Sequence, residues 1–458
     1  MSEHLLSVGL DVGTTSTQLV VSELTVENRA SAFAVPEMQI TERNIRYKSP
    51  VYFTPLTDES HVDGGAIREI VKNEYEKAGI CQSNVDTGAI IITGETSRKE
   101  NAKAVLNALS DFAGEFVVAT AGPDLESVLA AKGAGAVDYS QRTGKTVLHM
   151  DIGGGTSNLA LIENGKILRT GCLNVGGRLL KLDERGRVIY VSPVLQGIVD
   201  LKTGDRPKED ELQSVARILA RGLEMAAGLS MPTSLMDTLT TKETGRAWIP
   251  PEAEVVISFS GGVADCIEKA HPPLAFGDIG PALGQAIRES LLCRGEYVLG
   301  EETIRATVIG AGCHSAQLSG STVFYRNVSL PVKNLPVAVF TEEQQESADL
   351  PERIRHRIAE KDHPIVVLAM PGYDAPTYEK ITALADKICR GVGEKPVYIC
   401  LEADMAKALG HSLSLRLPND TPCLCIDRLK LQGESFLDIG SPVGPAISVV
   451  IKTLIMSN

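Results

Sequence analysis

Residues 8–16 read VGLDVGTTS, and residues 148–157 read LHMDIGGGTS. In each stretch an apolar run ends in an aspartate, and a glycine-rich turn with hydroxyl side chains follows. Glycine lets the backbone bend and approach a phosphate without a Cβ atom in the way. Backbone N–H groups and hydroxyls then face the phosphate oxygens. One such turn also suits a plain hairpin, but two turns of the same design predict two similar lobes that close on one polyphosphate.

The aspartates that precede the turns are Asp11 and Asp151. A carboxylate does not contact a phosphate directly, because like charges repel. Both aspartates fit the site if Mg²⁺ lies between, bound through the waters that it retains. We therefore predict that Asp11 and Asp151 are catalytic and metal-binding residues. The phosphate contacts are expected from Gly13, Thr14, Thr15, Ser16, Gly153, Gly154, Gly155 and Thr156.

A third strand-to-turn element follows residues 254–259, where residues 260–262 read SGG. Another glycine pair lies in the stretch NVGG at residues 174–177. Glycine turns in this order resemble those of the actin, Hsp70 and sugar-kinase superfamily. The resemblance implies that ATP binds between two lobes, with its purine against the third turn. The further nucleotide-binding residues that it implies are Gly176, Gly177, Gly261 and Gly262.

The same resemblance implies an α/β architecture, the actin-like (ribonuclease H-like) two-lobed ATPase fold. Small residues at 130–136 are expected to allow close helix packing between the lobes. Towards the end of the chain, apolar strands alternate with helices, which predicts a small parallel sheet. The expected parts are lobe I at 1–147, lobe II at 148–306, a connecting helix back to lobe I at 307–330, and an additional C-terminal α/β part at 331–458.

Four stretches resemble the bacterial ethanolamine-utilisation protein A family, namely GLDVGTTSTQ at 9–18, TGETSRKENA at 93–102, FLDIG at 436–440 and VVIKTL at 449–454. This likeness extends over the whole chain. It implies a chaperone-like reactivating factor that depends on ATP and Mg²⁺. Slow ATP hydrolysis is expected of a protein that works as a conformational switch. Such a factor releases damaged cobalamin from ethanolamine ammonia-lyase, so that adenosylcobalamin can rebind. The implied partners are therefore the lyase and ATP or ADP, and cobalamin is handled on the partner enzyme.

Glu95, at the end of a strand, is the candidate for positioning the attacking water. The alternative for Glu95, and the more frequent role of such a residue, is an interaction with free N–H groups at a helix start. Asn158 stands where Hsp70-type sequences often carry an acidic residue. Two other functions remain open: a small-metabolite kinase of the same superfamily, and a non-catalytic microcompartment scaffold with a relic nucleotide site.

Composition limits the cellular location and the kinds of partner that we expect. The hydrophobic fraction of 43% is that of a soluble globular protein, and the net charge of −13 argues against a nucleic-acid or anionic-membrane surface. The nine scattered cysteines make a disulfide framework unexpected. No signal peptide is expected, because the first strand begins close to Met1. We therefore expect a cytoplasmic protein, with association with a bacterial microcompartment as one option.

Overall fold

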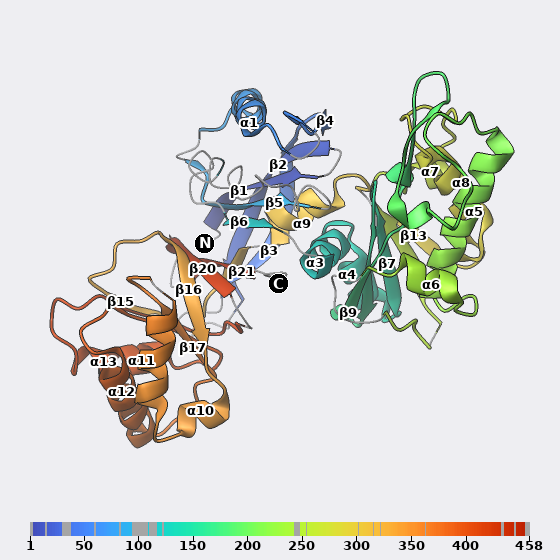
Figure 1. Ribbon diagram of the computed structural model, residues 1–458. Coiled ribbons are helices and arrows are strands. Elements are labelled where there is room, and N and C mark those ends of the chain that lie inside the picture. Colours follow the sequence, from blue (N-terminus) through green and yellow to red (C-terminus); the bar gives the residue numbers. More distant parts are fainter. Residues whose placement is uncertain are drawn as a thin grey trace.

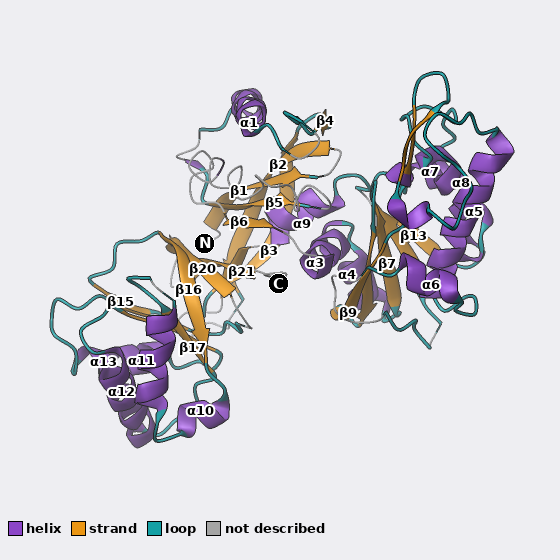
Figure 2. Cartoon of the chain, viewed as in Figure 1, coloured by secondary structure: helices purple, strands orange, loops and turns teal. Residues whose placement is uncertain are grey.

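The computed structural model describes residues 3–13, 16–29, 38–58, 61–81, 84–93, 109, 117–120, 123–241, 248–252, 254–300, 302–314, 316–320, 322–361, 363–431, 435–443 and 446–453. The described strands form three large sheets, and helices lie between and around them (Figures 1 and 2). None of the described helices combines the length and the apolar character that crossing a membrane requires.

The first sheet contains the first glycine turn. Its strands lie in the order β3-β2-β1-β5-β6, and β4 pairs with β2. The strands β1, β2 and β3 are antiparallel, whereas β5 and β6 run parallel to β1. The bounds are β1 Glu3–Val12, β2 Ser16–Asn28, β3 Met38–Lys48, β4 Tyr52–Phe53, β5 Thr87–Ile92 and β6 Val117–Thr120.

The second sheet repeats this arrangement. Its order is β9-β8-β7-β12-β13, with β7, β8 and β9 antiparallel and with β12 and β13 parallel to β7. The strands are β7 Val147–Ile152, β8 Ser157–Glu163, β9 Lys166–Leu173, β12 Val256–Ser260 and β13 Tyr297–Leu299. Since β1 and β7 occupy equivalent central positions, the two glycine turns that follow them are structurally equivalent. The protein therefore has the actin-like two-lobed fold that the sequence predicted.

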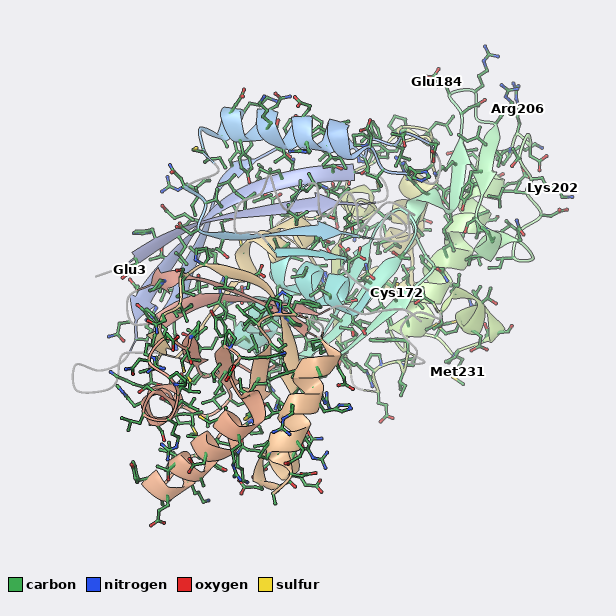
Figure 3. All side chains as sticks on the ribbon, turned by 60° about the vertical axis from the view of Figure 1, so that its left-hand side comes forward. Glu3, Cys172, Glu184, Lys202, Arg206 and Met231 are labelled. Atoms are coloured by element: carbon green, nitrogen blue, oxygen red, sulfur yellow. The ribbon has the colours of Figure 1, made fainter. Side chains whose placement is uncertain are left out.

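Helices cover both faces of the second sheet (Figure 1). The amphipathic helix α5 Glu209–Ala226 and helix α8 Gly280–Glu289 pack in one apolar cluster with β7 and β12. On the opposite face lie α3 Pro123–Gly133 and α4 Ala136–Thr143. Cys172 lies inside this lobe, whereas Glu184, Lys202 and Arg206 project from its outer end (Figure 3). The smaller elements are η3 Gly177–Leu179, β10 Leu180–Leu182, β11 Val188–Val191, η4 Pro193–Leu195, α6 Ser234–Leu239, α7 Asp265–Glu268 and η5 Leu291–Cys293.

The helices α3 and α9 Ala306–His314 cross between the first two sheets (Figure 1). Their backbones touch, because a Cβ atom built on Gly310 would lie 2.0 Å from the carbonyl oxygen of Leu129. A Cβ atom on Gly133 would lie 1.9 Å from the carbonyl oxygen of Ala306. The close packing expected from the small residues near 130–136 is therefore confirmed.

The third sheet contains the chain's C-terminal strands, in the order β14-β21-β20-β16-β17-β18-β19-β15. The strands β16 to β19 are parallel, and the helices between them share one core on one face. This confirms the predicted alternation of strands and helices. The strands are β14 Ala316–Leu318, β15 Phe324–Arg326, β16 Val332–Val339, β17 Val367–Met370, β18 Val397–Leu401, β19 Cys423–Ile426, β20 Ser435–Val443 and β21 Ala446–Thr453. The helices are α10 Glu342–Glu346, α11 Leu350–Glu360, α12 Tyr378–Val392 and α13 Ala406–Ser414.

The edge of the first sheet is interrupted near Pro50. Strand β3 ends at Lys48 and β4 starts at Tyr52. Pro50 lies between these strands, where it has no N–H group to donate to a sheet ladder. The short strand β4 brings Phe53 opposite Ser16 of the first glycine turn.

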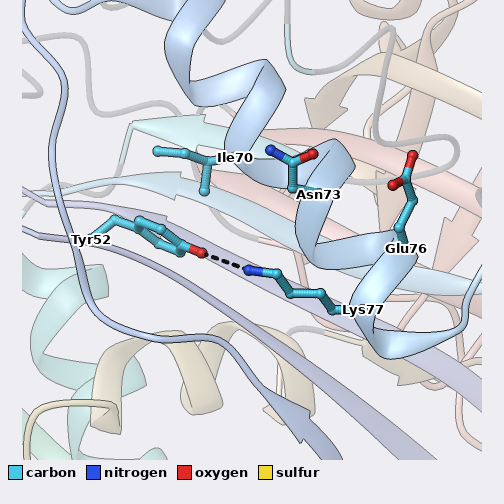
Figure 4. Close-up of a pocket in the computed structure, with 5 residues that line it drawn as sticks. All are labelled: Tyr52, Ile70, Asn73, Glu76 and Lys77. Atoms are coloured by element: carbon cyan, nitrogen blue, oxygen red, sulfur yellow. Dashed lines mark hydrogen bonds between the residues drawn. The ribbon is translucent and has the colours of Figure 1, made fainter.

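A buried carboxylate attaches β4 to helix α1 Gly64–Ala78. The carboxylate of Glu74 accepts hydrogen bonds from Tyr47 Oη at 2.7 Å, Tyr52 Oη at 2.6 Å and Lys77 Nζ at 2.7 Å. Lys77 also donates to Tyr52, across the hollow shown in Figure 4. This network holds Tyr52, and with it strand β4, beside the first glycine turn.

The crossing of α3 and α9 predicts the effect of one methyl group. Alanine favours a helix over glycine by about 1 kcal/mol, yet Gly310→Ala is expected to destabilise the protein by about 1–3 kcal/mol, because the helices must separate. The measurement is the midpoint of thermal unfolding. Gly295→Ala, where a Cβ atom meets nothing within 4 Å, is the control and should change little. Equal midpoints for the two variants would contradict the packing described.

The Glu74 network predicts a pH dependence of stability. Burial alone would raise the pKa of Glu74, but the bonds from Lys77, Tyr52 and Tyr47 hold it below its ordinary value of 4.5. The network therefore stabilises the protein above that pH and less as the pH falls through the lowered pKa. Glu74→Gln should unfold at a lower temperature at neutral pH and lose less stability on acidification. The exposed Glu76→Gln on the same helix is the control, and it should retain the wild-type pH profile.

Candidate functional site

A cavity of about 470 Å³ lies between the first two lobes, where the three glycine turns meet. The predicted residues that line it are Asp11, Gly13, Ser16, Asp151, Gly153, Gly154, Gly155, Thr156, Gly177, Gly261 and Gly262. Gly176 lies behind the second turn. Thr14, Thr15 and Glu95 lie outside the described residues. The structure therefore brings residues from all three predicted turns to one cavity.

The two phosphate turns close in the same way. In the first turn the N–H of Gly13 donates to the carbonyl oxygen of Ser16 at 2.9 Å. In the second, the N–H of Gly153 donates to the carbonyl oxygen of Thr156, also at 2.9 Å. Each turn is thus closed by the same kind of backbone hydrogen bond, and each connects a central strand to the antiparallel strand that follows.

The glycine pair at 176–177 supports the second turn from behind. The N–H of Gly177 donates to Gly153 at 3.1 Å, and the N–H of Arg178 donates to Gly154 at 2.6 Å. A Cβ atom on Gly176 would lie 2.3 Å from the carbonyl oxygen of Gly154. Gly176 is therefore needed for the approach of two backbone segments.

The third turn lies directly beside the second. Gly261 has φ of +90°, and a Cβ atom there would lie 2.3 Å from the carbonyl oxygen of Ile152. That same oxygen accepts a hydrogen bond from the N–H of Val263 at 3.1 Å. Glycine at position 261 thus permits both the left-handed backbone and the close approach to the end of β7.

The carboxylates of Asp11 and Asp151 share this cavity, and the charge of Asp151 acts on Asp11. Burial raises the pKa of Asp11 to about 7; the bond from Thr93 Oγ1, at 2.8 Å, opposes this effect, and the charge of Asp151 adds to it. Burial raises the pKa of Asp151 to about 6, against bonds from Ser260 and Thr307. Two buried carboxylates in one cavity repel each other, and a cation between them would remove that repulsion.

Two amide oxygens accompany the aspartates. Gln18 pairs with Asp11 across β1 and β2, and Asn158 pairs with Asp151 across β7 and β8. Both amides line the cavity, and in the described part of the chain Gln18 Oε1 and Asn158 Oδ1 are buried without a hydrogen-bond partner. Mg²⁺ binds oxygen atoms, either directly or through its waters, which donate hydrogen bonds to carboxylate and amide oxygens. These residues therefore fit a hydrated magnesium ion. Among the described side chains, no group of three or more Asp, Glu, His or Cys could hold a metal alone.

A buried histidine supports Asp151, and the sequence analysis did not identify it. His149 Nδ1 lies 3.0 Å from Ser258 Oγ, and Nε2 lies 3.0 Å from Ser260 Oγ. Burial lowers the pKa of His149 to about 3, so the ring is neutral. Because Ser260 donates its hydrogen to Asp151, it accepts from Nε2–H, and Nδ1 then accepts from Ser258.

A pattern in the sequence does mark this chain of hydrogen bonds. Polar residues alternate at positions 149 and 151 of β7 and at 258 and 260 of β12, within otherwise apolar strands. The parallel register places His149 beside Ser258 and Asp151 beside Ser260. Alternating positions share one face of a strand, so the pattern signals a polar line that leads to the cavity.

Comparisons with known proteins give consistent results. The family model "Ethanolamine utilisation protein EutA" matches residues 3–457. Two proteins named ethanolamine ammonia-lyase reactivase EutA are similar along almost their whole length. The one from Salmonella typhimurium is 40% identical over 99% of both chains, and the one from Escherichia coli is 38% identical over 99% of both chains.

Similarity to solved structures is more distant. A Ppx/GppA family protein from Aquifex aeolicus is 13% identical, with a TM-score of 0.42, over 67% of this chain and 97% of that chain. The ethanolamine utilisation protein EutJ from Carboxydothermus hydrogenoformans is 17% identical, with a TM-score of 0.33, over 67% of this chain and 88% of that chain. The assignment to a family accordingly rests on sequence: the protein belongs to the ethanolamine utilisation protein EutA family.

Proposed function

We propose that this protein is an ATP-dependent reactivating factor that releases damaged cobalamin from ethanolamine ammonia-lyase, so that adenosylcobalamin can rebind. Membership of the EutA family and the names of its two relatives support the choice of partner. The main support for ATP binding is the pair of equivalent aspartate–glycine turns, one from each lobe, that line one cavity.

In this proposal the two turns bind the phosphates through backbone N–H groups. Ser16 acts from the first lobe, and residues 154–156 act from the second. The N–H groups of Gly13 and Gly153 close their own turns, so these two glycines let the backbone approach the phosphates. Asp11 and Asp151, with Gln18 and Asn158 beside them, hold the waters of a magnesium ion. Magnesium supplies positive charge that offsets both the carboxylates and the phosphates. Gly261 and Gly262 leave an open backbone surface for the purine.

Nucleotide binding would act on the partner through movement of the lobes. Each lobe contacts the phosphates from its own side, so loss of the terminal phosphate removes contacts that hold the lobes together. We assign the lobes to residues 1–147 and 148–306, and partner contact or lobe capping to 331–458. The connecting helix expected at 307–330 is shorter than that range, because α9 ends at His314 and the later strands β14 and β15 belong to the third sheet. Only a difference in affinity for the lyase between the two states can drive release.

The central experiment measures cobalamin exchange on inactivated ethanolamine ammonia-lyase. Exchange is followed with ATP, ADP, a non-hydrolysable ATP analogue and no nucleotide. We expect exchange with ATP and magnesium, and none without nucleotide. Exchange that proceeds equally in all four conditions would refute an ATP-dependent factor. Exchange with the analogue would show that binding suffices for release.

The aspartate pair gives the first prediction for the site. Asp11→Asn and Asp151→Asn keep the shape of the side chain and remove its charge. Each should weaken magnesium-dependent ATP binding at least about tenfold, as expected for residues that orient metal-bound waters, and should slow cobalamin exchange. Titration calorimetry with ATP, with and without magnesium, measures the change. Asp200→Asn is the control, because that side chain is 97% exposed; an equal effect there would exclude a specific role.

The chain of hydrogen bonds through His149 gives the second prediction for the site. His149→Gln retains an amide N–H that can donate to Ser260, whereas His149→Leu removes both ring nitrogens. We expect the leucine variant to need about tenfold more magnesium for half-maximal ATP binding, and the glutamine variant to lie close to wild type. Magnesium titrations of ATP binding provide the measurement, and circular dichroism checks folding. Equal magnesium requirements in a folded leucine variant would show that His149 only fills the core.

A further inference from the structure

Arg178 contacts both lobes at the mouth of the candidate nucleotide cavity. Its backbone N–H donates to Gly154 of the second phosphate turn at 2.6 Å. Its guanidinium carbon lies 6.0 Å from the ring centroid of Phe53. Phe53 belongs to β4 of the first lobe, where it pairs with Ser16 of the first phosphate turn. One residue thus joins the two turns, through its backbone on one side and its side chain on the other.

The charges around the cavity show why a cation is needed at this place. The described residues that line the cavity include five carboxylates, from Asp11, Glu126, Asp151, Asp265 and Asp278. The lysine and arginine side chains among those described lining residues are Arg178 and Lys269. A triphosphate brings further negative charge, so it requires positive partners beyond magnesium. Lys269 follows α7, next to the third turn, whereas Arg178 is bonded to the second phosphate turn.

A buried aspartate holds the guanidinium in this position. Arg178 Nε lies 3.3 Å from Asp278 Oδ2, and the Arg178 side chain is only 24% exposed. Asp278 Oδ1 accepts the N–H of Gly280 at the start of α8, at 2.8 Å, so the carboxylate is itself fixed. A guanidinium has five N–H donors, and one contact through Nε leaves donors for a phosphate. Arginine suits such a site, because its planar donors match phosphate oxygens.

Resting on the proposed nucleotide site, we propose that Arg178 binds the terminal phosphate of ATP and, through Phe53, couples the presence of that phosphate to closure of the two lobes. The side chain then distinguishes ATP from ADP. Loss of the terminal phosphate leaves Arg178 paired with Asp278 alone, and the contact between the lobes at Phe53 is weakened.

The test compares the affinities for ATP and ADP, each with magnesium, in Arg178→Gln, Arg178→Lys and Lys269→Gln. Arg178→Gln should lose roughly 10- to 100-fold in ATP affinity, as expected for a charge-assisted hydrogen bond, and much less in ADP affinity. Arg178→Lys should recover part of the loss. Lys269→Gln removes the same charge from the same cavity, and it should weaken ATP and ADP binding by similar factors.

Two outcomes separate the inference from the function on which it rests. Wild-type protein that binds neither nucleotide would overturn both. Wild-type protein that prefers ATP, together with an Arg178→Gln variant that keeps the same preference, would overturn the inference alone.

Closure has its own readout, the decrease in radius of gyration that ATP causes in X-ray scattering. Phe53→Leu should reduce this decrease, with ATP affinity within about threefold of wild type. Leu56→Ala, another exposed apolar residue near β4, is the control and should close as wild type does. Full closure of Phe53→Leu would overturn the coupling.

Discussion

The candidate site depends on two carboxylates, those of Asp11 and Asp151, that line one cavity and are costly to ionise there. Each carboxylate lies at the end of a central strand, and burial raises both pKa values. Such an arrangement is unfavourable while no cation is bound, because ionising a buried carboxylate costs free energy that a nearby positive charge offsets. It becomes favourable when a cation and its oxygen ligands enter the cavity. The fold thus places two acids in one cavity where ionisation is costly, and either protonation or a bound cation removes that cost.

The surrounding residues support these carboxylates in equivalent ways on the two sides. Each aspartate has an amide opposite it on the neighbouring strand, Gln18 in one lobe and Asn158 in the other. Each also accepts a hydroxyl from the adjacent parallel strand or the loop after it, Thr93 for Asp11 and Ser260 for Asp151. The lobes differ in that the second extends its chain of hydrogen bonds to His149. The duplication therefore reaches beyond the backbone to the polar groups around each acid.

Much of this fold was predictable, because strand-to-glycine turns impose local geometry that survives in any context. The equivalent turns at Asp11 and Asp151, the close helix packing near 130–136 and the C-terminal alternation of strands and helices all follow from short-range patterns. Arg178 and His149 were not predicted. The role proposed for Arg178 depends on its contact with Phe53 of β4. Strand β4 lies next to the first turn, where the network around Glu74 holds it. His149 matters because a parallel register sets it beside Ser258 and Ser260, and a single sequence does not specify that register.

The order of elements after the crossing of α3 and α9 has a mechanical consequence. Helix α9 ends at His314, and β14 begins at Ala316, so the connection between them is very short. Strand β14 pairs with β21, the last described strand, in the sheet that also contains the parallel C-terminal strands. The helix that crosses between the two lobes is therefore directly continuous with the third sheet, and a rotation of α9 would displace that sheet as well.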